Sequence, residues 1–171
     1  MSTFGREGPY KNRVGFDGIA QAMSGNMHMT GHDGENYKSN APYCDFGTAM
    51  SAAFGVMVAL RHRDQTGEGQ VVEGTLMRTG VTMMNSYLIE QAITAPDRVP
   101  TGNLGQTAGP ADLYQAKDGQ VLVQVVSNNL YRRWTKLMDD PEKWANDERF
   151  KDDISRGTNG HILSAAMTIW C

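Results

Sequence analysis

The sequence predicts an α/β chain, on three observations. Apolar residues recur at helical spacing in several stretches between residues 16 and 95. The runs DLYQA and QVLVQVV flank an Asp-Gly pair at 118–119, which is typical of a β-hairpin. Between these halves, residues 96–111 hold three prolines and three glycines, a composition that predicts a linker or a mobile loop. We therefore expect one domain over residues 1–95 and a second over 112–171.

The first domain is expected to be helical. A short amphipathic helix begins near Phe16 and ends near residue 24, and a polar, turn-rich loop covers residues 31–44. Residues 48–63 predict a longer helix with one broad apolar stripe, which Gly67 stops.

Further elements follow in order. Residues 70–73 predict a short strand, and Thr75 is placed to cap a long helix that ends at Pro96. After the hairpin, Ser127 is expected to cap a helix whose inward side chains are Leu130, Trp134, Leu137 and Met138. A last amphipathic helix carries Ile162, Leu163, Ala166, Ile169 and Trp170, and no Gly, Pro or basic residue follows it as a cap.

The content of large apolar residues is low. Phe, Leu, Ile and Val make up 31 of 171 residues, about 18%, where roughly 20% marks the lower end for globular chains. The net charge of −3 is too small to indicate disorder. Together with the uncapped last helix and the Gly-rich start, this composition predicts a piece of a larger protein, whose apolar faces pack against other segments.

Charge and cysteine usage exclude several functional classes. The 16 basic and 19 acidic residues nearly balance and form no block of one sign, so we expect neither a nucleic-acid nor a membrane-surface partner. No uninterrupted apolar run approaches the roughly 20 residues of a membrane span. Cys44 and Cys171 lack metal-binding spacing, which predicts no metal site, no disulfide scaffold and a cytoplasmic location.

Asp45 is the most suggestive carboxylate. It lies where the polar loop meets the long helix and is followed by Phe46 and Gly47. Backbone N–H groups and the positive end of the helix dipole meet there, so an ionised carboxylate is stabilised and can act as a nucleophile. An aspartate at this place can equally serve as a helix cap alone. The residue pattern leaves both interpretations open.

Two other motifs could carry chemistry. His28 and His32 flank Gly31 and could exchange protons near neutral pH, although loop histidines are usually only solvated. The GNLGQTAG segment, with Gly102 and Gly105, could form a lid or an anion-binding loop, although a plain linker has the same composition.

Several segments together resemble the family III CoA-transferases, the group that includes formyl-CoA transferase and carnitine CoA-transferase. They are FGREGPYKNRVGFDGIAQAMSG at 4–25, DFGTAMSAAFGVMVALRHRDQTGEGQVVEGTL at 45–76, Gly-Asn at 102–103, LYQAKDGQVLVQV, and DERF at 147–150 followed by Arg156. Their order and spacing match over nearly the whole chain, and the pattern ALxxRxxTGxGQxV at 59–72 is quite specific to that family.

The resemblance implies covalent chemistry at Asp45. In the family, an aspartate just before this helix attacks the thioester carbonyl of an acyl-CoA and forms a mixed anhydride. CoA then forms a thioester with the same carboxylate, and the acceptor acid finally takes CoA. A dry helix start would hold such a carboxylate in a reactive orientation. Coenzyme A is therefore expected as a substrate, with no permanently bound cofactor.

The resemblance also implies further site residues. Arg13, Phe16 and Asp17 match the stretch that lies along CoA, and Gly102 and Gly105 match by position a glycine loop that closes over the intermediate, although the family's run of consecutive glycines is absent.

One branch of the family, the α-methylacyl-CoA racemases, shares the fold and moves protons through a histidine and an aspartate. Their histidine falls where this sequence has Phe16, which cannot transfer a proton. Two alternative hypotheses remain: that the protein transfers protons as the racemases do, or that the chain is an inactive truncated fragment.

The fold implied by the resemblance is the end of a Rossmann-like large domain followed by part of a small α+β domain. Family members are more than twice as long as this chain, and two of them interlock as a homodimer. The acyl donor and the acceptor acid are not specified by any motif in the chain.

Overall fold

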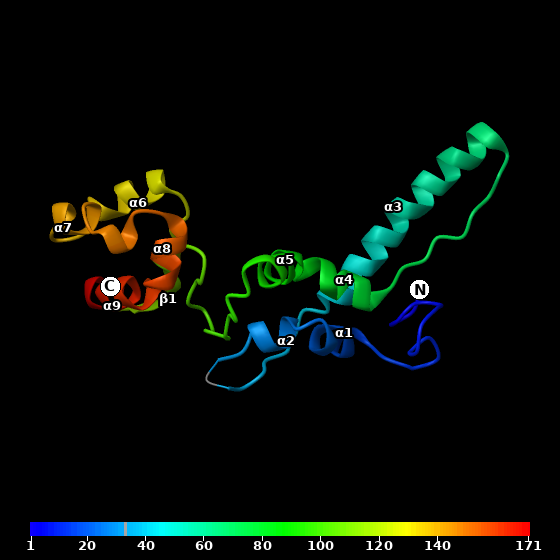
Figure 1. Ribbon diagram of the computed structural model, residues 1–171, viewed down its shortest axis with the longest axis horizontal. Helices are drawn as coiled ribbons and strands as arrows, with labels where there is room; N and C mark the ends of the chain where they lie inside the picture. The colour runs from blue at the N-terminus through cyan, green and yellow to red at the C-terminus, as the bar shows by residue number, and fades with distance from the viewer. Residues whose placement is uncertain (33) are drawn as a thin grey trace. The chain divides into compact units, whose positions relative to one another are not determined.

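In a computed structural model, which describes residues 1–32 and 34–171, the chain forms two compact units, Met1–Pro100 and Thr101–Cys171 (Figure 1). The division falls inside the segment 96–111 that the sequence predicts as a linker. Residues 101–110 belong to the second unit: the Gly105 N–H donates to the Ala111 carbonyl at 2.7 Å, and the Val125 N–H donates to the Pro110 carbonyl at 2.9 Å.

The first unit is helical in its described residues. Its helices are α1 (Asp17–Met23), α2 (Asn26–Met29), α3 (Tyr43–Thr66), α4 (Leu76–Met83) and α5 (Asn85–Thr94). Helix α1 contacts α2, α3 and α4, and α4 in turn contacts α3 and α5.

The long helix predicted after Thr75 is two helices. Met84 leaves helical geometry at φ −94° and ψ 6° and separates α4 from α5. Its N–H lies near both the Gly80 and the Val81 carbonyls, so the last turn of α4 tightens before the chain changes direction. Thr75 stands at the N-cap position of α4, but its side chain makes no capping bond.

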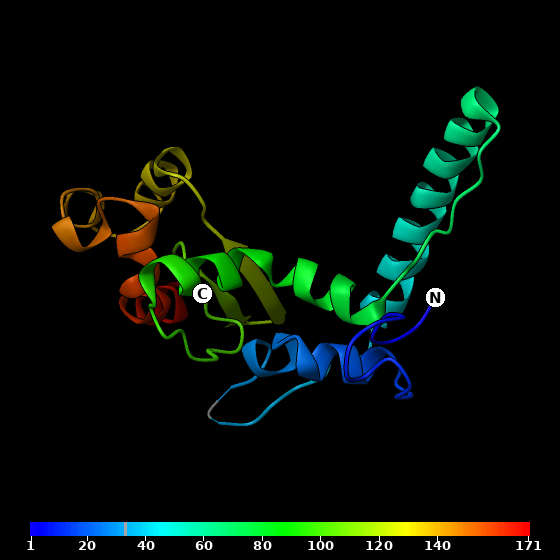
Figure 2. The ribbon, with the colours of Figure 1, turned by 45° about the vertical axis from the view of Figure 1, so that its right-hand side comes forward.

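The strand predicted over residues 70–73 is absent. This segment is an irregular connection that runs back beside α3 (Figures 1 and 2). Its backbone has no strand partner among the described residues, and only Thr75, just beyond it, forms an isolated parallel bridge with Ser2. A strand needs a neighbour for its hydrogen bonds, so the β-branched composition alone was misleading.

Helix α3 starts earlier than predicted and exposes its apolar stripe. It begins at Tyr43 rather than residue 48, and it ends as predicted at Gly67, which takes the left-handed conformation with φ 79°. Phe54 is 73% exposed, and Met50, Met57 and Val58 are exposed as well. The buried residues of α3 are Cys44, Gly47 and Thr48, all near its start.

By length and composition alone, α3 could cross a membrane, with a mean hydropathy of 1.3. Such a helix is weak evidence for a span, because core helices of soluble proteins have the same composition. Its apolar residues are interrupted by Gly, Ser and Thr, which is why the sequence shows no continuous apolar run.

The second unit combines one hairpin with short helices. Strands β1 (Ala111–Ala116) and β2 (Gly119–Gln124) pair antiparallel, with Ala116 opposite Gly119, which confirms the predicted hairpin. The link consists of Lys117 and Asp118. The remaining elements are α6 (Asn128–Thr135), α7 (Pro141–Ala145), the 3-10 turn η1 (Glu148–Phe150), α8 (Asp153–Thr158) and α9 (Gly160–Trp170).

An aromatic core holds this unit together. Its buried members are Tyr114, Val125, Tyr131, Trp134, Met138, Phe150, Leu163 and Met167. Ser127 caps α6 as predicted, because its side chain accepts the Leu130 N–H. Trp134 and Met138 face inward as predicted, whereas Leu130 and Leu137 are exposed. Helix α6 ends at Thr135, so Leu137 no longer follows the helical spacing on which that prediction relied.

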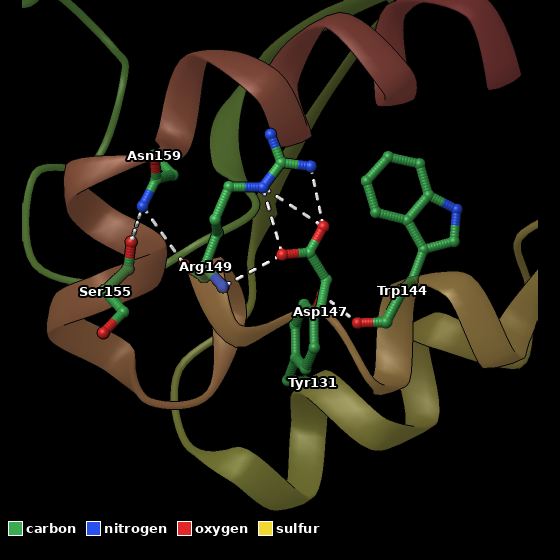
Figure 3. Close-up of polar contacts among 6 residues, drawn as sticks. All are labelled: Tyr131, Trp144, Asp147, Arg149, Ser155 and Asn159. Carbon is green, nitrogen blue, oxygen red and sulfur yellow. Dashed lines mark hydrogen bonds and ion pairs between the residues drawn. The ribbon is translucent and has the colours of Figure 1, made fainter.

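The segment after α7 is tied by polar contacts. The Asp147 carboxylate accepts bonds from the Arg149 side chain at 2.7 to 3.2 Å, and the Asn159 amide donates to the Arg149 and Ser155 carbonyls (Figure 3). The Tyr131 hydroxyl donates to the Trp144 carbonyl at 2.9 Å (Figure 3). These contacts connect α6, α7 and α8 around the turn that contains the DERF motif.

Arg156 is the buried charge of this unit. Its guanidinium donates to the Phe150 carbonyl and the Asn128 side chain, each at 2.8 Å, and pairs with Asp153 at 2.5 Å. It also lies over the Tyr131 ring, 4.6 Å from the centroid. A buried cation needs such partners, and here they connect η1, α6 and α8.

Candidate active site

The sequence predicts Asp45 just before the long helix. The structure places it instead in the first turn of α3. Its side chain is exposed on this chain, next to exposed Phe46. The carboxylate therefore projects from the positive end of a 24-residue helix. The dry surroundings expected for it are not supplied by the described residues of this chain.

The first N–H groups of α3 all have acceptors. Helices leave these groups unsatisfied unless a cap is supplied, and the N-cap residue here is Pro42, which has no side-chain acceptor. The Tyr43 N–H donates to the Ala41 carbonyl at 2.9 Å, and the Phe46 N–H to the Pro42 carbonyl at 3.1 Å. The remaining two N–H groups, of Cys44 and Asp45, need an acceptor from elsewhere in the chain.

That acceptor is Asp17, in the first turn of α1. Its Oδ2 accepts the Cys44 N–H at 2.8 Å and the Asp45 N–H at 3.2 Å. Asp17 is only 7% exposed, and its Oδ1 accepts a bond from the Gln21 side-chain amide one turn later in α1. Two segments 28 residues apart in sequence are thus joined at the backbone of Asp45.

Gln21 extends this network to the loop before α3. Its Oε1 accepts the Ser39 N–H at 2.9 Å, and its Nε2 also lies 3.3 Å from the Ser39 carbonyl oxygen. The Ser39 hydroxyl in turn accepts the Ala41 N–H at 3.2 Å. The amide of Gln21, which is almost fully buried, therefore fixes the approach of the chain to α3.

On its other side, the start of α3 is held against α4. The Thr48 hydroxyl lies 2.6 Å from the Thr79 hydroxyl and donates to the Cys44 carbonyl at 2.6 Å. Gly47 faces the same helix, and a Cβ atom there would come within 2.8 Å of the Thr79 methyl group. The close approach of the two helices thus favours glycine at position 47, two residues after Asp45.

The residues around the Asp17 carboxylate keep their protons. Burial, together with the charges of Asp17 and Asp45, raises the pKa of the Cys44 thiol to about 11. Burial, followed by the neighbouring Cys44 and Asp17, raises the pKa of the Tyr43 hydroxyl to about 12. Neither side chain is thus a nucleophile at neutral pH, because the thiolate or phenolate is scarcely populated.

The three residues expected to contact CoA differ in their exposure and in their neighbours. Phe16 is 75% exposed at the N-cap position of α1, directly before Asp17 and so near the start of α3. Arg13 is exposed and lies over the Tyr10 ring, 4.2 Å from the centroid. The structure thus brings Asp17 and Asp45 together, and CoA binding by Arg13, Phe16 and Asp17 stays a prediction.

Gly102 and Gly105, expected in a lid, both lie in the second unit. Gly102 is exposed with φ 63°, a conformation that favours glycine. Gly105 packs closely, because a Cβ atom there would come within 2.6 Å of the Ala111 Cβ. The lid role of both residues stays a prediction.

Sequence reasoning missed Gln21, Ser39 and the capping task of Asp17. One local signal could have indicated them: Asp17 and Gln21 are spaced i, i+4, which places both on one helix face. The second signal is Pro42, whose lack of a side-chain acceptor beside Asp45 implies an acceptor from a distant segment.

Comparisons with known proteins agree over the whole chain. The sequence profile of CoA-transferase family III matches residues 1–171. Among curated proteins, the succinyl-CoA–D-citramalate CoA-transferase of Chloroflexus aurantiacus is 31% identical over 172 residues, which cover 99% of this chain and 42% of that protein. The succinyl-CoA:mesaconate CoA-transferase of Haloarcula marismortui is 30% identical over 156 residues, covering 91% and 39%.

Solved structures give the same picture. A CaiB/BaiF family protein from Brucella suis matches with a TM-score of 0.74 and 25% identity, over 98% of this chain and 44% of that one. A hypothetical protein from Mycobacterium tuberculosis matches in fold, with a TM-score of 0.78 and 22% identity, over 98% and 44%. The predicted α/β fold class is confirmed, and the chain spans less than half the length of these proteins. The named activities of the curated relatives do not favour the racemase alternative.

Proposed function

Because this chain belongs to CoA-transferase family III, we propose that it carries the nucleophile of an enzyme that moves CoA from an acyl-CoA to a carboxylic acid. Asp45 is that nucleophile. The observation that carries the proposal is its placement: an exposed carboxylate on the first turn of α3, whose backbone is held by Asp17. The chain spans about 42% of the relative from Chloroflexus, so the activity is proposed for the full-length protein.

The proposed reaction exchanges one thioester for another. The Asp45 carboxylate attacks the thioester carbonyl, the C–S bond breaks, and CoA leaves as a thiolate, which gives an acyl-aspartyl anhydride. The thiolate then attacks the Asp45 carbonyl carbon, which releases the donor acid as a carboxylate and leaves an aspartyl-CoA thioester.

The acceptor acid reverses these steps. Its carboxylate attacks the aspartyl thioester and forms a second anhydride with release of the CoA thiolate. The thiolate attacks the acyl carbon of the acceptor, so the new acyl-CoA leaves and Asp45 is free again. No net proton transfer occurs over these four steps, and the Asp45 carboxylate is regenerated at the end.

We take succinyl-CoA as the donor and a dicarboxylic acid as the acceptor. The support is the naming of the relatives: succinyl-CoA appears in the names of those from Chloroflexus and Haloarcula, with citramalate or mesaconate as the second substrate. A mouse relative, 28% identical over 143 residues, is named succinyl-CoA:glutarate CoA-transferase. These acids carry two carboxylates, one of which remains free in the CoA ester.

The full-length protein is further proposed to act as a cytoplasmic homodimer without a permanent cofactor, a nucleic-acid partner or a membrane partner. The exposed apolar stripe of α3 supports additional polypeptide around this helix.

Trapping tests the role of Asp45. Full-length protein is mixed with succinyl-CoA and hydroxylamine, and the peptide that contains Asp45 is analysed by mass spectrometry. We expect a hydroxamate at Asp45 in the wild type, and loss of both the label and turnover in Asp45→Ala.

Asp64→Asn is the matched control, because Asp64 lies near the far end of the same helix in an exposed pair with Arg63. It should keep wild-type turnover. Full turnover in Asp45→Ala would exclude the proposed nucleophile.

A further inference from the structure

The carboxylate of Asp17 has a task that CoA binding does not explain. It is buried, and both of its oxygens accept hydrogen bonds from the protein itself. Two of those bonds come from the backbone N–H groups of Cys44 and of Asp45. A carboxylate committed in this way acts on the protein backbone, whatever it contributes to ligand binding.

We propose that Asp17 is the positioning residue for the nucleophile: by accepting the Cys44 and Asp45 N–H groups, it fixes the backbone from which the Asp45 carboxylate projects. This inference rests on the proposed role of Asp45. It assigns Asp17 no contact with the reacting atoms.

The geometry makes this cap specific. Pro42 cannot cap α3, and Tyr43 and Phe46 donate to neighbouring carbonyls, so Cys44 and Asp45 are the N–H groups of the first turn that depend on a remote acceptor. Without Asp17, two buried or half-buried donors would lose their partner at the turn that carries the nucleophile. Unsatisfied donors of this kind favour fraying of the first turn.

The Asp17 carboxylate is itself immobilised. Gln21 holds Oδ1, and the same amide is fixed to the backbone of Ser39. Asp17 also stands in the first turn of α1, so its carboxylate lies where the starts of α1 and α3 meet. The raised pKa of the Cys44 thiol reflects, after burial, the charge of Asp17 beside it.

Positioning matters because nucleophilic attack needs the reacting atoms at near-contact distance and in line. A displacement of about 1 Å at a reacting group can cost about 100-fold in rate. We therefore expect Asp17→Ala to slow acylation of Asp45 by about 100-fold. If Asp17 acts only on the backbone of Asp45, the KM for succinyl-CoA should change by less than about 3-fold, whereas a larger rise in KM would indicate a CoA contact instead.

The test uses the full-length protein and measures single-turnover labelling of Asp45 by succinyl-CoA and hydroxylamine. Asp17→Asn is the conservative variant: its single side-chain oxygen can still accept the Cys44 and Asp45 N–H groups, while the bond from Gln21 is lost, so labelling should recover to within about 5-fold of the wild type. Asn26→Ala is the control for stability. Asn26 donates to the Gly80 carbonyl at 2.9 Å in the same unit and is not bonded to α3, so this variant should label Asp45 at the wild-type rate.

The outcomes separate the two proposals. A wild type that is never labelled at Asp45 contradicts the nucleophile itself. A labelled wild type with a folded Asp17→Ala that reacts equally fast overturns the positioning role alone, as does an Asp17→Asn that is as slow as Asp17→Ala. If Asp17→Ala does not fold, Asp17→Asn is the deciding variant. A labelling rate near that of the wild type supports the positioning role. A folded Asp17→Asn protein that is labelled about 100-fold more slowly overturns it.

Discussion

The two units of this chain bury opposite kinds of residues. In the first unit, the described buried side chains are mostly polar, among them Asp17, Gln21, Thr48 and Thr79, while the large apolar side chains of α3 are exposed. In the second unit, aromatic and aliphatic side chains are buried around Tyr131, and Arg156 is the buried charge.

The difference shows which interactions determine the structure of each unit. The second unit completes a hydrophobic core from its own residues, so its stability is a matter of packing. The first unit is specified by hydrogen bonds that place the start of α3, while the large apolar side chains further along that helix, such as Phe54 and Met57, are exposed. Phe, Leu, Ile and Val are similarly frequent in the two units, 17 of 100 residues and 14 of 71, so the units differ in which of these side chains are buried and not in how many there are.

The largest effect should come from deleting a core ring of the second unit. Phe150 is 1% exposed, so Phe150→Ala should lower the free energy of unfolding of the 171-residue chain by about 3 to 5 kcal/mol, measured by urea denaturation. Phe54→Ala, on the exposed stripe of α3, is the matched control and should cost less than about 0.5 kcal/mol. Equal losses would mean that the stripe is covered in solution.

Removing the buried cation should cost slightly less. Arg156→Met removes the donor to the Phe150 carbonyl and the cationic partner of Asp153, and we expect a loss of about 3 kcal/mol in the same measurement. Arg149→Met, which breaks an exposed pair with Asp147, should cost less than about 1 kcal/mol. A similar cost for both variants would remove the distinction between the two arginines.

A methyl group at Gly157 should disturb the second unit by overpacking. Its Cβ atom would come within 2.3 Å of the Gln106 carbonyl oxygen, which belongs to the backbone, so Gly157→Ala should cost about 2 kcal/mol. At Gly119 an added Cβ meets nothing within 4 Å, so Gly119→Ala should change stability little. An unchanged melting temperature for Gly157→Ala would contradict this close approach.

Alkaline pH should weaken the first unit. Folding raises the pKa of the Cys44 thiol from 9.0 to about 11. It raises the pKa of the Tyr43 hydroxyl from 10.0 to about 12. The unfolded state therefore binds fewer protons above pH 9, and stability falls as pH rises through this window. Cys44→Ala should flatten the fall in urea midpoint between pH 9 and pH 11, and an unchanged slope would argue against a buried thiol.

Acid should have the smallest effect, and it should act on the second unit. Hydrogen bonds from Arg149 lower the pKa of Asp147 from 3.8 to about 2. The corresponding stabilisation is present above pH 4 and is lost as pH falls toward 2, because only the unfolded state gains the proton at first. Asp147→Asn should remove this part of the acid dependence of the urea midpoint, and an identical acid profile would count against the pair.

The sequence predicted correctly those elements that depend on interactions between residues close together in the chain. The hairpin around 118–119, the stop of α3 at Gly67 and the Ser127 cap each depend on a few neighbouring residues, and all three are confirmed. The predicted strand over 70–73 failed because a strand depends on a partner that the described residues do not supply. Periodicity likewise predicted an apolar stripe on α3, whose members Met50, Phe54 and Met57 are exposed, but such a pattern cannot say what covers these side chains.

The sequence supports a prediction for one residue of the candidate site but not for the contacts that hold it. Asp45 follows from its place at the start of a helix together with the family resemblance, whereas the bond from its N–H to Asp17 spans 28 residues. Such a contact depends on how α1 packs against α3, which no local pattern encodes. Phe16 and Asp17 were expected together as CoA contacts, but one is exposed and the other is buried in the backbone network.

The tethering of α3 at one end has a mechanical consequence. The helix has 24 residues and is about 36 Å long, and its buried residues lie within the first turns. A tilt of about 5° around that end would move the far tip by about 3 Å but would shift a residue in the first turn by only about 0.3 Å. Asp45 thus lies close to the point about which α3 tilts, where thermal motion of the helix displaces it least.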